Sequence, residues 1–256
     1  MTLNDQVALV TGGSRGIGAA VCHALAADGA AVAVNYRSDE SAAKQVVADI
    51  EAGGGRAVAI RGDVSDHAEA GAVIAAVLSA LGGLHILVNN AGISRDALIY
   101  SMTPADCWDV MRVNFGGVFN CTQAVLPHFM AKGEGVIVNV SSVMGERGWI
   151  GESNYAASKG AVNAFTRCTA MESARFGVRV NAVLPGFAAT ELVISLSEGA
   201  TGKAIRRQIP MRDFGAVEQV AQVVRFLAGP ESGYMTGSLV NVDGGAMAAL
   251  GLGRPS

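Results

Sequence analysis

Short apolar runs alternate along the chain with longer segments in which apolar residues recur every three or four positions. Runs that are apolar throughout predict strands buried on both faces, and the longer spacing predicts amphipathic helices. The expected strands cover 7–11, 30–36, 56–63, 85–92, 135–142, 178–186 and 238–245. The expected helices cover 17–27, 41–52, 69–81, a segment from about 104, 115–131, 155–176 and 217–228.

This alternation of strands and helices is typical of a parallel sheet with helices on both faces and right-handed crossovers. No Pro-, Ser- or charge-rich linker divides the 256 residues, and no repeat or low-complexity segment interrupts them. We therefore expect an α/β fold, a single-domain Rossmann-type doubly wound sheet of about seven parallel strands, spanning residues 1–256.

Composition narrows the function classes. A net charge of -3 gives no electrostatic reason to bind nucleic acid or an anionic membrane. No run is apolar for long enough to span a membrane, and the N-terminus does not read as a secretory signal. The four cysteines are far apart and the four histidines lack ligand spacing, which predicts reduced thiols and no metal site. A cytoplasmic protein is expected.

Polar residues and glycines follow the predicted strands. Ligands bind beyond the carboxyl ends of such strands, which meet at one edge of the sheet. The residues at these ends are Thr11, Asn35, Asp63, Asn89, Ser142 and Pro185. This edge is where the sequence predicts function.

The stretch TGGSRGIG (11–18) lies between the first strand and the first helix. Its glycines Gly12, Gly16 and Gly18 would let the backbone approach a diphosphate at the helix N-terminus, where free N–H groups and the helix dipole favour an anion. The G-x-x-x-G-x-G spacing differs from the general dinucleotide fingerprint, so an ordinary strand-to-helix turn is the alternative.

The end of the second strand favours NADP over NAD. An acidic residue there would bind the ribose 2′-hydroxyl of NAD, but the strand ends Asn35-Tyr36-Arg37 and no acid precedes Asp39. Arg15 lies within the glycine loop. Two arginines suit the 2′-phosphate of NADP, although solvated side chains are the alternative.

Tyr155 and Lys159 share one face of the long helix, four residues apart. A nearby ammonium would lower the tyrosine pKa and so make the phenol a usable proton donor near neutrality. Ser142 ends the preceding strand, where its hydroxyl would bind a substrate oxygen. A Y-x-x-x-K spacing by itself also fits a plain surface pair.

The motifs together resemble the short-chain dehydrogenase/reductase family. The glycine loop, NNAG (89–92), SS (141–142), Y-x-x-x-K (155–159) and PG (185–186) occur in that family's order, from Val7 to about Gly245. Among its members the chain looks most like 3-oxoacyl-(acyl-carrier-protein) reductases, through NNAGISRD, NYAASKGAV, VNAVLPGFAAT and YMTGSLVNVDGG. Acetoacetyl-CoA reductases and polyketide ketoreductases share much of this pattern.

The resemblance implies roles for individual residues. Tyr155 would be the catalytic acid/base, Lys159 would lower its pKa and hold the nicotinamide ribose, Ser142 would position the carbonyl oxygen, and Asn114 would support a proton relay through water. The implied NADP(H)-binding residues are Gly12, Ser14, Arg15, Gly16, Ile17, Gly18, Tyr36, Arg37, Asp63, Val64, Asn89, Asn90, Ala91, Gly92, Asn114, Tyr155, Lys159, Pro185, Gly186 and Thr190.

The implied reaction is NADPH-dependent reduction of a 3-oxoacyl thioester, and its carrier stays open between acyl carrier protein, CoA and a free ketone. Basic residues for a carrier protein are few: Lys132, with Arg167 and Arg175 farther along. A substrate lid is expected over about 187–213, with further substrate residues in 94–102 and 144–153. Trp149 would line the pocket or simply pack, and Arg206 and Arg207 would meet a phosphate or lie solvated.

Two other functions remain as alternatives. One is a dehydrogenase or reductase of another alcohol or ketone, such as a polyketide, sugar, steroid or xenobiotic carbonyl. The other is a noncatalytic NADP(H)-binding protein on the same fold, which would have no need of Tyr155. The resemblance also implies a homotetramer.

Overall fold

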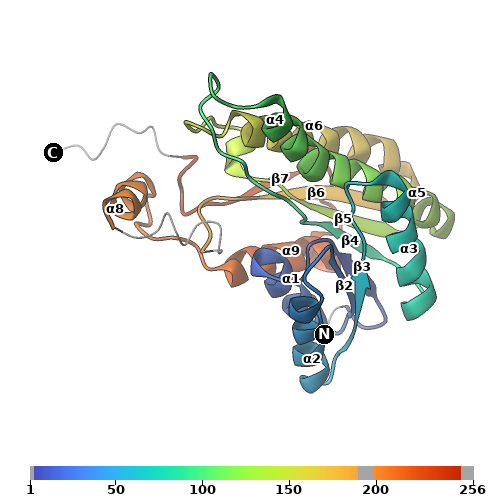
Figure 1. Cartoon of the computed structure of the whole chain (residues 1–256). Coiled ribbons are helices and arrows are strands. Elements are labelled where there is room, and N and C mark those ends of the chain that lie inside the picture. The colour runs from blue at the N-terminus through green and yellow to red at the C-terminus, as the bar shows by residue number, and fades with distance from the viewer. Residues whose placement is uncertain (1–2, 190–198, 249–256) are drawn as a thin grey trace.

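The computed structural model describes residues 3–189 and 199–248. Its centre is a seven-stranded sheet in the order β3-β2-β1-β4-β5-β6-β7, in which every neighbouring pair is parallel (Figure 1). The strands are β1 (Val7–Val10), β2 (Ala31–Tyr36), β3 (Arg56–Arg61), β4 (Ile86–Asn89), β5 (Gly135–Val140), β6 (Val178–Pro185) and β7 (Leu239–Val242). The predicted doubly wound parallel sheet is confirmed.

Helices cover both faces of this sheet (Figure 1). Helices α1 (Gly16–Ala27), α2 (Glu40–Ala52) and α9 (Val217–Ala228) pack on one face. Helices α3 (His67–Leu81), α5 (Gly117–Lys132) and α6 (Ser153–Ser173) pack on the other, and α4 (Pro104–Met111) leads into α5. A further helix, α8 (Gly199–Gln208), lies apart from the sheet (Figure 1).

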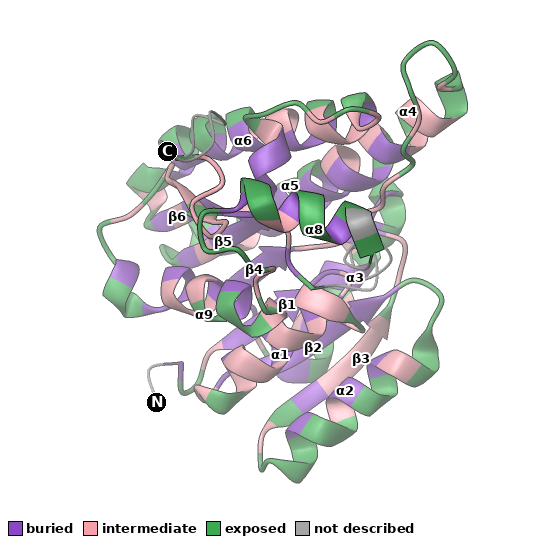
Figure 2. Ribbon diagram, turned by 90° about the vertical axis from the view of Figure 1, so that its left-hand side faces the viewer, coloured by how far each residue is buried: buried purple, intermediate pink, exposed green. Residues whose placement is uncertain are grey.

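The central strands β1 and β2 are apolar almost throughout because both of their faces are buried (Figure 2). The edge strands β3 and β7 are partly exposed. Along β1, Ala8 and Val10 face the layer of α1 and α9, whereas Val7 and Leu9 face the layer of α3 and α5. Successive strand side chains point to opposite faces, so one short run contributes to both cores. This double burial explains why no polar alternation appears in the sequence of these strands.

The strand order reverses beside β1. The chain builds β1, β2 and β3 outward on one side, and β4 then returns to pair with the other edge of β1. The loops after β1 and β4 therefore diverge and open a crevice at the carboxyl ends of these strands, the usual ligand site of such a sheet. This reversal places the glycine loop opposite the NNAG segment.

Two predicted helical boundaries are wrong. The predicted helix from about 104 and the helix 115–131 are one continuous helix, joined by a π-helical segment, Arg112–Gly116, that contains Asn114.

Within the stretch predicted as a lid, residues 199–208 form α8, and residues 190–198 lie outside the described part of the chain. In the described residues, no helix is both long and apolar enough to cross a membrane.

Candidate active site

The glycine loop between β1 and α1 needs its glycines for conformation and for space. Gly12 and Gly16 have φ of 60° and 54°, which side chains rarely adopt. A Cβ on Gly18 would lie 2.2 Å from the Gly12 carbonyl oxygen and 2.6 Å from Nδ2 of Asn90. The loop, which also includes Ser14 and Ile17, therefore presents bare backbone to the crevice.

Side chains from neighbouring strands hold this loop in place. The amide of Asn90 donates to the carbonyl oxygens of Thr11 and Gly12 at 3.0 and 3.1 Å. The Thr11 hydroxyl accepts from the backbone N–H groups of Asn90 and Ala91 at 2.9 and 3.0 Å. Asn90 and Ala91, predicted as cofactor contacts, thus also tie β4 to the glycine loop.

A second hydrogen-bond centre lies at the end of β2. The Asn35 side chain accepts from the Gly12 N–H at 3.3 Å and donates to the carbonyl oxygens of Ile60 and Gly62 at 3.2 and 3.1 Å. One buried amide thereby joins the ends of three strands. Tyr36 is also buried, with its side chain in the core rather than in the crevice.

The N-terminus of α1 fits a diphosphate. Among the described residues, no side chain caps the first turn of α1, so its N–H groups face the crevice. Gly16, Ile17 and Gly18 start this helix, and the missing Cβ of Gly18 lets the Gly12 carbonyl and the Asn90 amide pack against its first turn. Unsatisfied N–H groups at a helix start are the donors that an anionic diphosphate requires.

The next strand end holds an ionised carboxyl group. Asp63 accepts hydrogen bonds from the Ser65 hydroxyl and N–H at 2.7 and 2.9 Å, and Arg37 lies 4.0 Å away. Burial raises the pKa of Asp63, but the Ser65 hydrogen bonds and the charges of Arg37 and Arg112 outweigh it and lower that pKa. Val64 is buried beside it, and its carbonyl oxygen accepts a hydrogen bond from the Asn120 amide at 3.0 Å.

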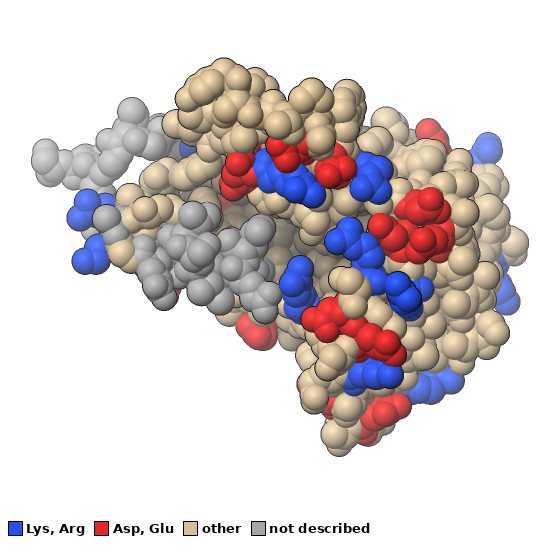
Figure 3. Space-filling view, viewed as in Figure 1, with Lys and Arg blue, Asp and Glu red and all other residues tan. Residues whose placement is uncertain are grey.

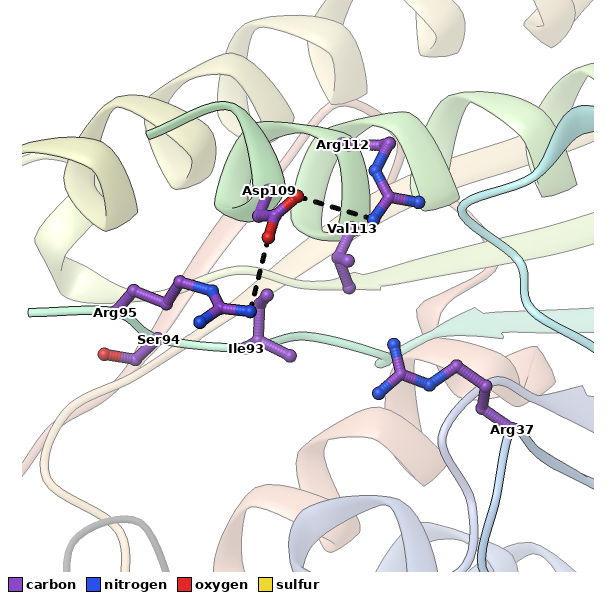
Figure 4. A pocket seen from close by; sticks show the side chains of 7 residues that line it. All are labelled: Arg37, Ile93, Ser94, Arg95, Asp109, Arg112 and Val113. Atoms are coloured by element: carbon purple, nitrogen blue, oxygen red, sulfur yellow. Dashed lines mark ion pairs between the residues drawn. The ribbon is translucent and has the colours of Figure 1, made fainter. Parts of the chain in front are cut away.

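Arg37, which pairs with this carboxyl group, also lines a pocket of about 190 Å³ (Figure 4). Arg95 and Arg112 flank Asp109 at 3.3 and 3.5 Å, and Arg37 faces them across the cavity (Figure 4). Figure 3 shows basic and acidic side chains side by side around the hollow on this face. The lining is completed by Ile93, Ser94 and Val113.

The sequence prediction did not single out Asp109 or Arg112, and it included Arg95 only within the predicted substrate stretch 94–102. Arg95 follows the NNAG segment by three residues, and Arg112 precedes Asn114 by two. Their positions close to these motifs in the sequence could have indicated them. Only the packing of α4 over the loop after β4 brings these charged side chains close to Arg37.

The predicted catalytic side chains converge where β5 meets α6. Tyr155 lies on the first turn of α6, and hydrogen bonding with Ser142, which follows β5, acts to lower its pKa. Lys159 lies one turn farther on, 4% exposed, and its Nζ is 5.6 Å from the Tyr155 ring centroid. Nζ donates to the Val140 carbonyl oxygen at 2.9 Å. Sequence spacing and tertiary packing agree here.

Burial opposes the predicted lowering of the Tyr155 pKa by Lys159. Burial, with smaller contributions from Glu152 and Asp96, raises the pKa of Tyr155 to about 12, although the hydrogen bond with Ser142 lowers it. Burial also lowers the pKa of Lys159 to about 8. Desolvation dominates because Lys159 directs its ammonium at a backbone carbonyl instead of the phenol.

Asn114 is fully buried in the π-helical segment. Its side chain accepts from the Ile93 N–H at 2.8 Å and donates to the Ile93 carbonyl oxygen at 3.0 Å and to the Ser158 hydroxyl at 3.1 Å. It therefore fixes the loop after β4 against α6. A Cβ on Gly92, in the same loop, would lie 3.3 Å from Oδ1 of Asn114.

An apolar wall continues from Tyr155. Trp149 and Phe187 meet edge to face, 5.5 Å between ring centroids, and both pack with Tyr155 and Met144. Trp149 therefore packs within this wall. Pro185 ends β6 next to it, and the Gly186 N–H donates to Val242 at 2.9 Å.

Other predicted residues lie away from this centre. Arg206 pairs with Asp213 at 3.5 Å and lies over the Phe214 ring, whereas Arg207 is exposed at the end of α8. Arg167 pairs with Glu146 at 4.0 Å. Thr190 lies outside the described residues. The described part of the chain holds no cluster of three potential metal ligands.

A doubly wound sheet, a glycine-rich loop before its first helix and a partly buried tyrosine beside a buried lysine define a nicotinamide-dependent oxidoreductase. Residues 6–201 match the family model described as short chain dehydrogenase. The chain belongs to the short-chain dehydrogenase/reductase family.

Three similar proteins illustrate the range of that family. The chain is 45% identical over 244 residues to a 3-oxoacyl-(acyl-carrier-protein) reductase of Synechocystis sp., covering 95% of this chain and 97% of the relative. It is 43% identical to an acetoacetyl-CoA reductase of Rhizobium meliloti, covering 94% and 98%. A gluconate 5-dehydrogenase from Burkholderia cenocepacia, solved with NADP and tartrate, has a TM-score of 0.93 and 36% identity, with 97% of each chain covered.

Proposed function

We propose that the protein reduces a 3-oxoacyl thioester to the 3-hydroxyacyl thioester with NADPH. The observation that carries this proposal is the position of Tyr155, which lies beside Ser142 and Lys159 and packs against the apolar wall of Trp149 and Phe187. A polar reacting end beside an apolar wall suits a carbonyl that bears an acyl chain. The names of two relatives, a 3-oxoacyl-(acyl-carrier-protein) reductase and an acetoacetyl-CoA reductase, support the same class.

Each side chain has a task in this reaction. A nicotinamide held by the glycine loop and Lys159 would supply the hydride for the carbonyl carbon. Tyr155 donates its phenolic proton to the carbonyl oxygen, and Ser142 hydrogen-bonds that oxygen and orients it. Lys159 would return a proton to the Tyr155 phenolate and would bind the nicotinamide ribose. Asn114 holds the loop and α6 in register, so that a water relay to Lys159 keeps its place.

We propose NADP rather than NAD as the cofactor. Arg37 directly follows β2, and 59% of its side chain is exposed, so that it can contact a 2′-phosphate. The end of β2 carries no acid for a ribose hydroxyl. Arg15 is exposed on the glycine loop beside it. The NADP in the related gluconate 5-dehydrogenase structure supports this choice.

The other proposed cofactor contacts follow the crevice. The glycine loop and the start of α1 bind the diphosphate. Asp63 and Val64 bind the adenine, the segment Asn89–Gly92 lines the adenosine, and Pro185, Gly186 and Thr190 meet the nicotinamide. The stretch 187–213 is the proposed lid, within one domain that spans 1–256.

The assay is NADPH consumption with acetoacetyl-CoA, with Tyr155→Phe as the inactive control. Turnover by the wild-type protein alone supports thioester reduction. Comparison of acyl carrier protein and CoA thioesters then identifies the carrier. Bound NADPH without turnover would reject the thioester.

The alternative with a specific observation behind it is oxidation or reduction of a sugar acid, since a gluconate 5-dehydrogenase shares the fold at a TM-score of 0.93. The same assay with 5-ketogluconate tests it directly. Preferred turnover of that anion would replace the thioester proposal.

We also propose a cytoplasmic homotetramer. Large apolar side chains are exposed on neighbouring helices of one layer, with Trp108 and Met171 at 68% and 74% exposure and Phe119 at 39%. Such a surface is typical of subunit contacts. Light scattering of the purified protein measures the assembly, and a monomer would contradict it.

A further inference from the structure

One carboxyl group beside the candidate catalytic tyrosine has no assigned role. Glu152 is the N-cap residue of α6, three residues before Tyr155, and it is half-buried. Its side chain neither caps the helix nor pairs with any cation among the described residues. The sequence prediction did not single it out, because it falls inside a loop of mixed composition.

A second carboxyl group is held opposite Glu152 by contacts between two loops. The Ala97 N–H donates to the Gly151 carbonyl oxygen at 2.9 Å, and the Asn154 amide donates to the Arg95 carbonyl oxygen at 2.9 Å. These two bonds fasten the loop after β4 to the start of α6. Asp96 lies between them in sequence, and the Ser94 hydroxyl donates to its carboxylate.

Both carboxyl groups act on the reacting position. Burial and the charge of Asp96 raise the pKa of Glu152 to about 7. Glu152 and Asp96 in turn each raise the pKa of Tyr155. The phenol is therefore exposed to the negative charge of both carboxyl groups, and an anion bound next to it would be repelled by the same charge.

The nearby cations are occupied elsewhere. Arg95 turns its guanidinium to Asp109 at 3.3 Å and Asp106 at 4.0 Å. Lys159, which lies under Tyr155, donates to the Val140 carbonyl. Neither offsets the Glu152 carboxylate within the described part of the chain.

We propose that Glu152, reinforced by Asp96, selects substrates by charge: it disfavours carbonyl compounds that carry a carboxylate near the reacting carbon and favours neutral esters and thioesters. This inference deepens the proposed function and rests on it, since it separates thioester reduction from the reduction of sugar acids at the same site.

The physical cause is repulsion in a partly desolvated site. Two like charges within several ångströms repel by roughly 1–3 kcal/mol at an intermediate effective dielectric. Glu152 becomes neutral as the pH falls through about 7, so part of this repulsion is removed there. Charge selection is therefore expected to be strong in mild alkali and weaker in mild acid.

The test compares two β-keto compounds that differ in one charge, ethyl acetoacetate and acetoacetate. Acetoacetate remains an anion throughout the pH range used. The measured quantity is the ratio of kcat/KM for the ester to kcat/KM for the anion, with NADPH, at about pH 6 and about pH 8.5. The variants are Glu152→Gln and, as the matched control, Glu146→Gln, whose parent carboxylate is exposed on the same loop and pairs with Arg167.

The expected result is a ratio that falls about tenfold in Glu152→Gln at about pH 8.5. In the wild-type protein and in Glu146→Gln the ratio is expected to be several times larger at about pH 8.5 than at about pH 6, whereas in Glu152→Gln it stays flat. A merely structural role would slow both compounds alike and leave the ratio unchanged. An unchanged ratio, or the same change in Glu146→Gln, overturns the inference.

A binding measurement separates this inference from the proposed function. The dissociation constants of ester and anion are measured on the NADP⁺-bound protein, in which no hydride is available. If the wild-type protein turns over neither compound but Glu152→Gln still shifts the binding ratio, the proposed function fails and charge selection stands. If the ester is reduced and neither ratio responds to Glu152→Gln, the function stands and charge selection fails.

Discussion

The polar groups at the two ends of the crevice differ in how far their hydrogen bonds and charges are satisfied. At the glycine-loop end, Thr11 and Asn90 hydrogen-bond to each other's backbone, and Asn35 hydrogen-bonds to the backbone of Gly12, Ile60 and Gly62. At the substrate end, Tyr155 and Lys159 are titratable groups whose pKa values burial displaces in opposite directions. The first arrangement fixes the backbone in place. In the second, Tyr155 and Lys159, which must exchange protons, carry a free-energy cost because burial disfavours their charged forms.

The difference shows how one sheet edge combines rigidity with chemistry. Satisfied neutral amides stabilise the fold, because each would be costly to bury alone. A buried ammonium or a crowded carboxyl group costs stability, and a protein retains it for function. Substitutions at the two ends should therefore affect stability with opposite sign.

The largest effect is expected for Tyr155→Phe. Loss of the phenolic proton donor should reduce kcat for carbonyl reduction by about 10³-fold, within the range of general acid catalysis. NADPH affinity should change little, because the hydroxyl contributes to chemistry at the substrate end. Steady-state kinetics together with NADPH fluorescence titration measure both quantities, and substantial residual kcat would remove Tyr155 from its proposed role.

Asn35→Ala should destabilise the glycine-loop end. The change leaves the carbonyl oxygens of Ile60 and Gly62 without their buried donor and removes the acceptor of the Gly12 N–H. We expect a loss of about 2–3 kcal/mol in unfolding free energy. Urea unfolding measures it. The control Gln45→Ala removes an exposed side-chain hydrogen bond to Asp49 and should cost much less.

Lys159→Met should stabilise the protein while abolishing activity. A pKa lowered from 10.5 to about 8 corresponds to a buried-charge cost of roughly 3 kcal/mol, partly offset by the lost bond to Val140. We expect a net gain of roughly 2 kcal/mol near neutral pH. Urea unfolding is the measurement, and destabilisation would contradict the contrast between the two ends.

The pH dependence of that gain has a definite sign. Below about pH 8 both the folded and unfolded wild-type protein carry the Lys159 proton, so the full cost is present. Between about 8 and 10.5 the unfolded state binds the proton more tightly, and the stability of the wild-type protein rises with pH. The advantage of Lys159→Met should therefore shrink across this window. A constant advantage would mean that another property of the side chain causes it.

The smallest of these effects is expected for Arg37→Ala. Loss of the guanidinium should raise the dissociation constant of NADPH about tenfold and leave that of NADH nearly unchanged, since only NADPH carries the 2′-phosphate. Calorimetry with both cofactors measures the difference. Lys44→Ala, which removes an exposed cation of α2, is the matched control. Equal changes for NADPH and NADH would exclude Arg37 from reading the phosphate.

Much of the fold was predictable from local patterns. Runs such as VALV and AVAVNY are apolar throughout because both faces of β1 and β2 are covered, and the alternation with helices identified the parallel sheet. The separate helices predicted around 104–131 were wrong, because the π-helical turn at Asn114 passes through without a break. The local sequence does not show whether a helix continues through such a π-helical turn or ends there.

The candidate site was predictable where one short motif contains the whole arrangement. The glycine loop and Y-x-x-x-K set their own geometry through a turn and a helix. The carboxyl groups Glu152 and Asp96, and the pocket of Arg37, Arg95 and Arg112, are assembled from distant segments. Hydrogen bonds between loops bring each set together, and such contacts leave no periodic signal in the sequence.

The sequence by itself determined the layered sheet, the glycine loop and the choice of Tyr155, Ser142 and Lys159 as candidate catalytic residues. These features depend on residue type and short spacing. Only the tertiary structure decided the protonation equilibria. Desolvation depends on everything packed around a group, and here it raises the pKa of Tyr155 where the neighbouring lysine alone would have lowered it. Burial, which no single segment encodes, sets the charge that a substrate meets in this site.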